Sequence, residues 1–166
     1  YRNIKGTNTM RFCRKKDIPF NKKVTYARIV CDMRPQKDEV RRTRMTAGGD
    51  RLDYHGETST DVSGLNTIKI HWNSVLSTPN AKYMTMDISN MYLNTKLPSP
   101  EYMRIHISLI PKEILDQYKP TPDEKGFCYV EIIMAIYGLK QAGALANADL
   151  IKNLSKHNYI PMNRTP

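Results

Sequence analysis

The chain has 166 residues, 40% of them hydrophobic and 25% charged, an ordinary composition for one domain with a buried core. It contains no apolar run near the roughly 20 residues of a membrane span and no signal peptide, and its three cysteines form no CxxC pair. These features argue against a membrane-spanning protein, a disulfide framework and a zinc site, and they favour a reducing, intracellular setting.

The net charge of +10 is placed unevenly, because residues 1–45 alone carry a net +10 and the remainder is neutral. A basic end is typical of proteins that contact a phosphate backbone, where each neutralised phosphate releases counterions. A solubilising surface or a linker is the alternative. The residues expected to contact nucleic acid are Arg14, Lys15, Lys16, Lys22 and Lys23.

Three segments are expected along the chain: a basic linker or arm over residues 1–21, a folded body over 22–160, and an end segment over 161–166. Both ends have the look of cuts, since neither carries a terminal feature. In the body, residues 24–31 and 40–45 are rich in β-forming residues and flank a turn-like stretch, which predicts a β-hairpin with a basic face.

Residues 51–62 are polar and without a period, which predicts a loop, and apolar residues then recur at helical spacing over 65–76. Trp72 is expected to anchor this helix in the core, with a base-stacking ring as the alternative. Later strands and helices do not alternate strictly, so the predicted fold class is α+β rather than a doubly wound sheet. The later elements are a strand at 82–87, a turn or short helix at 89–94, strands at 101–107 and 127–133, a turn at 123–126, and helices at 111–118 and 141–157.

Asp87 stands at the end of the apolar strand predicted at 82–87, where a carboxylate is costly to bury unless it is paired or ligates a metal. Carboxylates that bridge two Mg²⁺ ions serve phosphoryl transfer by clamping the attacking and leaving oxygens. The alternative is an aspartate that caps the following turn. Tyr92, five residues on, has two readings as well: a ring that packs under a bound sugar, or an ordinary core residue.

Two further pairs of residues suit a phosphorylated ligand. Arg42 and Arg44 are alternate residues of one predicted strand, so they share a face, and arginine grips phosphate through two parallel hydrogen bonds. A solvated basic edge strand is the alternative. Lys140 and Gln141 follow a turn at the start of a predicted helix, where free backbone N–H groups favour phosphate. A plain turn before a helix is the alternative there.

Taken in order, these segments resemble the reverse transcriptase of copia-type long-terminal-repeat retrotransposons. Residues 135–141 read AIYGLKQ and are similar to the family's ALYGLKQ, which is the most specific match. Residues 86–93 (MDISNMYL) resemble LDVKNAFL, residues 101–104 (EYMR) resemble the start of VYMEQP, and residues 42–47 (RTRMTA) are a looser match to KARLVA. The resemblance covers roughly residues 22–160.

The resemblance implies a partial right-hand polymerase fold, with a fingers β-hairpin and an incomplete palm. By resemblance, Asp87 is the first catalytic, metal-binding aspartate for Mg²⁺ or Mn²⁺ in the full-length parent, and Tyr92 is the ring that rejects a ribose 2′-OH. Arg42 and Arg44 hold the triphosphate, and Gln141 contacts the nucleotide or template beside Lys140. The implied partners are an RNA or DNA template–primer, a dNTP and the remainder of the polymerase, in a cytoplasmic virus-like particle or the nucleus.

One family feature is absent from the sequence. Copia-type enzymes carry a later strand–turn–strand with adjacent aspartates, and this chain contains no Asp-Asp pair. A single aspartate cannot neutralise and space two Mg²⁺ ions, so residues 1–166 alone are predicted to be inactive. The alternative hypothesis is a non-catalytic remnant that binds nucleic acid through its basic first third.

Overall fold

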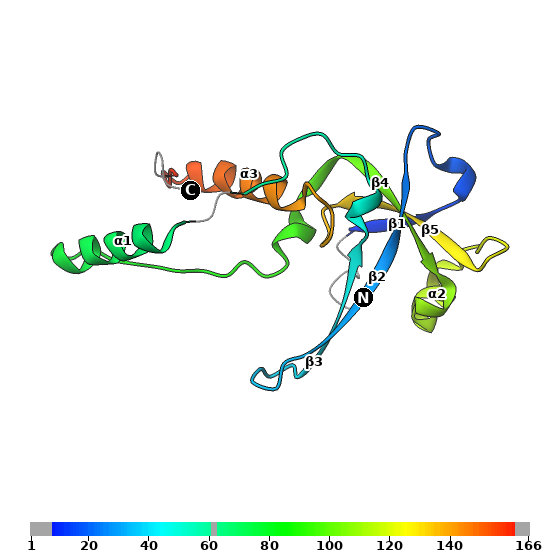
Figure 1. Cartoon of the computed structure of the whole chain (residues 1–166), viewed down its shortest axis with the longest axis horizontal. Coiled ribbons are helices and arrows are strands. Elements are labelled where there is room, and N and C mark those ends of the chain that lie inside the picture. Colours follow the sequence, from blue (N-terminus) through cyan, green and yellow to red (C-terminus); the bar gives the residue numbers. More distant parts are fainter. Residues whose placement is uncertain (1–7, 61–62, 162–166) are drawn as a thin grey trace.

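The computed structural model describes residues 8–60 and 63–161. Within these residues it is a mixed α+β structure, with three α-helices and one curled sheet of five strands (Figure 1). The strands are β1 (Met10–Cys13), β2 (Val24–Met33), β3 (Arg41–Ala47), β4 (Lys96–His106) and β5 (Phe127–Met134). The helices are α1 (Leu65–Ser77), α2 (Lys112–Tyr118) and α3 (Ala142–Ser155), with 3₁₀ turns at η1 (Lys15–Asp17), η2 (Gly49–Arg51), η3 (Met91–Asn94) and η4 (Ile107–Leu109).

The sheet has the strand order β1-β5-β4-β2-β3, in which only the β2–β4 pair is parallel. Strand β2 serves two partners in succession: its first residues, 24–26, pair with β4, and residues 27–33 pair with β3. The second half of β2 and all of β3 therefore extend beyond the other three strands as a long hairpin (Figure 1). This confirms the predicted hairpin.

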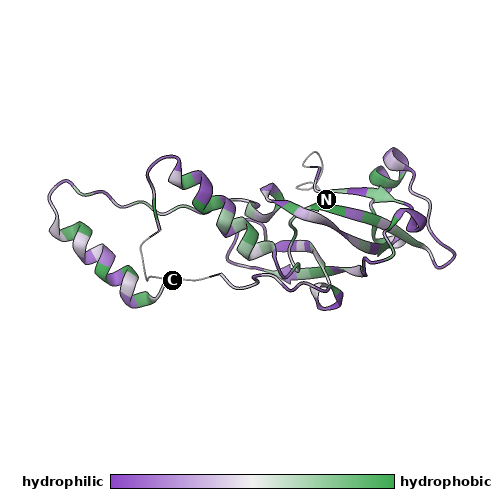
Figure 2. Ribbon diagram, turned by 90° about the horizontal axis from the view of Figure 1, so that it is seen from above, coloured by the Kyte–Doolittle hydropathy of each residue, from purple (hydrophilic) through white to green (hydrophobic). Residues whose placement is uncertain are grey.

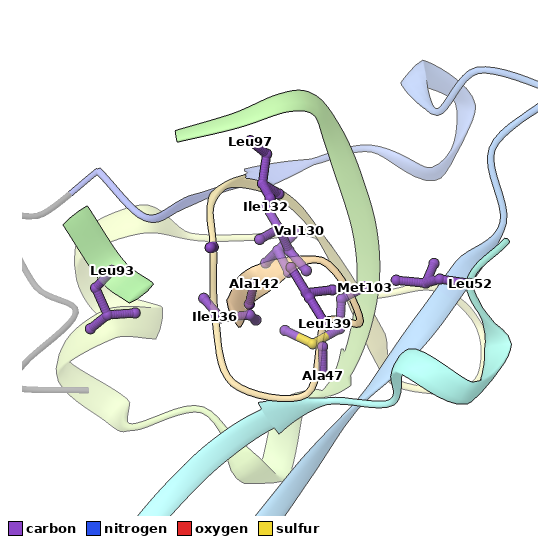
Figure 3. Packing of buried hydrophobic residues seen from close by; sticks show 11 residues of the cluster. Ala47, Leu52, Leu93, Leu97, Met103, Val130, Ile132, Ile136, Leu139 and Ala142 are labelled. Atoms are coloured by element: carbon purple, nitrogen blue, oxygen red, sulfur yellow. The ribbon is translucent and has the colours of Figure 1, made fainter. Parts of the chain in front are cut away.

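The main core lies where the sheet meets η3 and the beginning of α3 (Figure 3). Met103 of β4 and Ile132 of β5 have no exposed surface, and Leu93 of η3 and Leu139 close the cluster. A second cluster under α2 is built around Ile105, Ile110 and Cys128. Burial of these side chains supplies most of the stabilisation of the sheet, at about 1.5–3 kcal/mol for each large one.

Strand β1 corrects the prediction of a linker over residues 1–21. Met10–Cys13 pairs antiparallel with β5, and Met10 and Phe12 pack against the core while Arg11 bonds to Glu131 on the outer side. Four residues are too short a run for alternation to be recognised, and the partner strand lies some 120 residues later. Residues 1–7 of the expected arm, 61–62 of the expected loop and 162–166 of the expected end lie outside the described residues.

The strand predicted at residues 82–87 is wrong, since these residues form no strand and all are exposed. The helix predicted at 65–76 is confirmed as α1, but Trp72 is 52% exposed, so its predicted place in the core is also wrong. In both cases the apolar pattern is real, and the element that would cover it is not among the described residues. A pattern reports a surface that suits burial, and burial itself needs a partner.

The remaining predicted elements are confirmed. Residues 91–94 form the short helix expected near 89–94, the two later strands are β4 and β5, and the two later helices are α2 and α3. The turn expected at 123–126 is closed by the Gly126 N–H, which donates to the Asp123 carbonyl at 2.9 Å. None of the helices in the described parts of the chain is long and apolar enough to cross a bilayer.

The Asp123 carboxylate holds the turn before β5. It accepts hydrogen bonds from the backbone N–H groups of Phe127 and Lys125 at 2.9 Å and from the Tyr129 hydroxyl at 2.8 Å. These donors, the Phe127 N–H foremost, lower the pKa of Asp123. A lowered folded-state pKa stabilises the fold above the unfolded value of about 3.9, and this stabilisation is lost as the pH falls through the folded value.

Substituting Asp123→Ala is therefore expected to lower the melting temperature at pH 7 by about 2–4 °C, because three hydrogen bonds to one acceptor are removed. The difference between the variant and the parent should shrink as the pH falls below about 3.9 toward the lowered pKa of Asp123, because in that range the unfolded parent takes up a proton before the folded parent does. Thermal unfolding followed by circular dichroism at pH 7 and pH 3 measures both effects. Asp116→Ala on the exposed face of α2 is the control, and an equal loss there would contradict the assignment.

Candidate functional site

The base of the β2–β3 hairpin is bonded to the loop at residues 137–141, which follows β5. The Ala47 N–H donates to the Tyr137 carbonyl at 2.8 Å, and Lys140 Nζ donates to the Leu52 carbonyl at 3.1 Å. These bonds join segments about 90 residues apart in the chain. They place the beginning of α3 directly beside the end of β3.

Two glycines make this approach possible. Gly138 has a φ of +94°, and a Cβ there would lie 2.0 Å from the Ala47 carbonyl oxygen. A Cβ on Gly49 would lie 2.0 Å from the Gly138 carbonyl oxygen. Only backbone without side chains can pack this closely, and only glycine adopts the left-handed conformation without a penalty.

Tyr92 lies against the same loop. It belongs to η3, and its ring meets the ring of Tyr137 edge-on, with centroids 4.9 Å apart and an interplanar angle of 62°. Its hydroxyl is near the first turn of α3, since a Cβ on Gly143 would lie 3.9 Å from it. The hairpin base, Tyr92 and the loop at 137–141 are thus neighbours in space.

Gln141 is buried, with 3% of its surface exposed, and its side chain points to β4. Its Nε2 donates to Glu101 Oε1 at 3.5 Å, and Lys22 Nζ lies 3.5 Å from Glu101 Oε2. Gln141 Oε1 has no hydrogen-bond partner among the described residues. In this arrangement Gln141 joins the beginning of α3 to the sheet, and its amide is turned away from solvent.

Arg42 and Arg44 share one face of the hairpin with Asp32. Arg44 Nη2 lies 3.2 Å from Asp32 Oδ2, and Arg42 is the cross-strand partner of Asp32. Arg28 stands opposite Thr46 on the same face, one more cation that sequence reasoning did not single out. With three arginines and one aspartate this face has a positive charge, and Arg44 Nε has no partner within the described part of the chain.

Asp87 does not lie at the end of a strand, as the sequence predicted. It lies in the exposed stretch 82–88, and no strand or buried setting surrounds it. Across residues 8–60 and 63–161, no three carboxylate, histidine or cysteine side chains group closely enough to hold a metal ion. The single carboxylate therefore does not fit a two-ion magnesium site.

The predicted nucleic-acid contacts differ in their partners. Arg14 forms two hydrogen bonds to Asp17, at 2.8 and 3.1 Å, which lower the pKa of that carboxyl. Lys23 bonds to Asp53 at 2.7 Å and lowers its pKa in the same way, and Lys22 pairs with Glu101 as described above. Lys15 and Lys16 are exposed on η1. Whether these residues contact nucleic acid stays a prediction.

Sequence reasoning missed the buried acceptor Glu101. Its signal was present, because Glu101 shares a strand face with Met103 and Ile105, and an acid on an apolar face demands a partner. The identity of that partner could not be inferred, since Lys22 lies 79 residues away in the chain and Gln141 lies 40.

No protein-family model, no curated protein and no solved structure matches this chain. The functional assignment therefore depends on the sequence motifs and on the geometry of the described residues.

Proposed function

We propose that this chain is the fingers and the first part of the palm of a copia-type reverse transcriptase, an RNA-directed DNA polymerase, and that residues 1–166 do not polymerise by themselves. The observation that carries the proposal is the convergence of the hairpin base, Tyr92 and the loop at 137–141. These are three of the segments on which the sequence resemblance depends. Segments that bind one nucleotide must lie together in space, and their order along the chain does not by itself bring them together.

In this proposal the hairpin face of Arg28, Arg42 and Arg44 binds the phosphates of an incoming dNTP. Guanidinium groups bind phosphate oxygens through paired, charge-assisted hydrogen bonds. The Arg44 guanidinium is paired with Asp32 at 3.2 Å, and its buried Nε has no partner among the described residues. The contribution of these residues is positioning and charge neutralisation.

Tyr92 would lie against the sugar of the nucleotide, and its ring is supported from behind by Tyr137. Gln141 has a different role from the one expected by resemblance, because its buried amide bonds to Glu101. We assign it to holding the beginning of α3, and thereby the orientation of Tyr137 and Lys140. Mg²⁺ or Mn²⁺, when bound, supplies charge neutralisation, and the described residues alone do not make its site.

A second candidate function is a non-catalytic nucleic-acid-binding module. The exposed setting of Asp87 and the basic first third of the chain favour it. Both functions predict binding to a template–primer duplex, so binding alone does not separate them.

A primer-extension assay with Mg²⁺ and dNTPs tests the proposal, and with a longer chain it separates the two candidates. Residues 1–166 are expected to give no extension, and clear polymerisation would contradict that part of the proposal. The next 60 or so residues encoded by the parent gene should contain a strand–turn–strand with paired aspartates, and the chain extended through them should polymerise. In that longer chain Asp87→Asn is expected to lower the rate by about 10³-fold or more, with template–primer binding unchanged.

Asp116→Asn, an exposed aspartate on α2, is the matched control and should keep full activity. If an extended chain binds duplex and Asp87→Asn leaves its activity unchanged, the binding module is favoured.

A further inference from the structure

Residues 63–90 form an arm that extends from the sheet. It consists of α1 and of the returning segment 79–88, and in both views it lies at the end of the molecule opposite the sheet (Figures 1 and 2). Nine large apolar side chains of the arm are at least 37% exposed. They are Leu65, Ile68, Ile70, Trp72, Leu76, Tyr83, Met84, Met86 and Ile88.

The size of this surface matches that of a protein interface. Fully burying one large apolar side chain removes roughly 60–120 Å² from water, so the arm offers on the order of 500 Å² of apolar surface. The largest apolar patch of a typical monomer covers about 300–600 Å², and a patch of that size is often a functional surface. A standard interface buries about 800 Å² on each partner, somewhat more than half of it apolar, which is the amount that the arm supplies.

The charge of the arm permits a second copy to approach. The arm contains only Lys69, Lys82 and Asp87 as charged residues, so its formal net charge is +1. The net +10 of the chain arises in residues 1–45, which contribute the hairpin and β1 at the sheet end. Two arms can therefore meet while the basic parts of the two chains stay apart.

The arm also has the shape for pairing. Tyr83 packs edge-on against Trp72, with centroids 5.7 Å apart, and together with Val75 and Leu76 these rings line an apolar groove of about 150 Å³. Segment 82–88 is exposed, outside any strand, and carries apolar side chains at every second residue, 84, 86 and 88. An unpaired segment of this kind is a template for edge-to-edge pairing, and antiparallel pairing with its own copy satisfies both backbones.

We propose that the arm is a dimer interface, in which two copies of this chain pair their segments 82–88 antiparallel about a two-fold axis and cover them with their α1 helices. Such an interface is closed, because the same patch is used on both chains, so the assembly stops at two. The proposal concerns residues 1–166 by themselves, because segment 82–88 also carries Asp87, which the proposed function assigns to the active site of a longer chain.

Sedimentation velocity of nuclease-treated protein across a concentration series at physiological salt tests the proposal. The parent chain is expected to dimerise in a concentration-dependent way and to keep its dimer in high salt, because the contact is apolar. Leu76→Asp, at a side chain 86% exposed, should weaken dimerisation by about 100-fold or more, since each dimer contains two copies of the lost contact.

Met84→Asp, in the returning segment, should also weaken dimerisation. Because Met84 lies outside α1, this variant shows that the effect of Leu76→Asp is not merely local damage to that helix. Phe20→Asp is the matched control, because Phe20 is fully exposed and lies outside the arm, and it should leave the dimer unchanged. Circular dichroism checks that the sheet persists in each variant. A parent chain that stays monomeric, one that grows without limit, or a dimer indifferent to both arm variants would overturn the proposal.

Discussion

Replacing Gly138 by alanine is expected to lower the free energy of unfolding by about 3 kcal/mol or more. Two costs add at this position. The φ of +94° is unfavourable for any residue with a side chain, and the new Cβ would lie 2.0 Å from the Ala47 carbonyl oxygen. Neither the end of β3 nor the loop can yield without breaking the hydrogen bond from the Ala47 N–H to the Tyr137 carbonyl.

Urea unfolding at constant pH measures this loss, and Gly64→Ala is the matched control. Gly64 precedes α1, and a Cβ there meets only Thr67 Oγ1, at 3.9 Å, so the change should stay within about 1 kcal/mol. Gly49→Ala should lower stability by an amount similar to that of Gly138→Ala, because its Cβ would collide with the Gly138 carbonyl oxygen at the same contact. Equal stability of the Gly138 and Gly64 variants would show that the hairpin base and the loop are not packed as described.

Replacing Lys22 by methionine is expected to cost about 2 kcal/mol or more, because it leaves a buried carboxylate without its cation. The Glu101 side chain is only 11% exposed, and its remaining partner is the amide of Gln141. The neighbouring Lys23→Met is the control. Lys23 and Asp53 are each about 60% exposed, so solvent screens their attraction and loss of that pair should leave stability nearly unchanged.

A double substitution identifies the cause. If the uncompensated charge of Glu101 is responsible, Glu101→Gln should restore much of the stability lost in Lys22→Met, as measured by a double-mutant cycle in urea. If the aliphatic stem of Lys22 is what matters, methionine replaces most of it and the single variant should be nearly neutral. A neutral Lys22→Met would contradict the assignment of Glu101 as a buried, paired acid.

Where the local pattern of the sequence was sufficient, the fold could be predicted. The hairpin of β2 and β3 has β-rich strands on either side of a turn, and α2 begins after a proline. Each of these elements is formed mainly by residues close together in the chain. Strand β1 has only four residues and depends on β5, far along the chain, so no local pattern could reveal it.

Residues 82–88 show the opposite case. Their alternation of apolar side chains is the same signal that correctly predicted β4, yet β4 has neighbours on both sides and residues 82–88 have none within the described chain. Trp72 follows the same rule, since its helix formed and its burial did not. Whether an apolar pattern becomes buried depends on a partner, which the pattern does not contain.

The sequence by itself determined the types of most elements, the basic hairpin, and the motifs that nominate Tyr92, Lys140 and Gln141. Only the tertiary structure decided that Tyr92 meets the loop at 137–141, that this loop is bonded to the end of β3, and that Gln141 turns inward to Glu101. The physical reason is that element type follows from interactions within a few residues, whereas a site is assembled by contacts between segments tens of residues apart. Those contacts depend on the close approach of two glycines and on the pairing of a buried acid, which become evident only once the chain is folded.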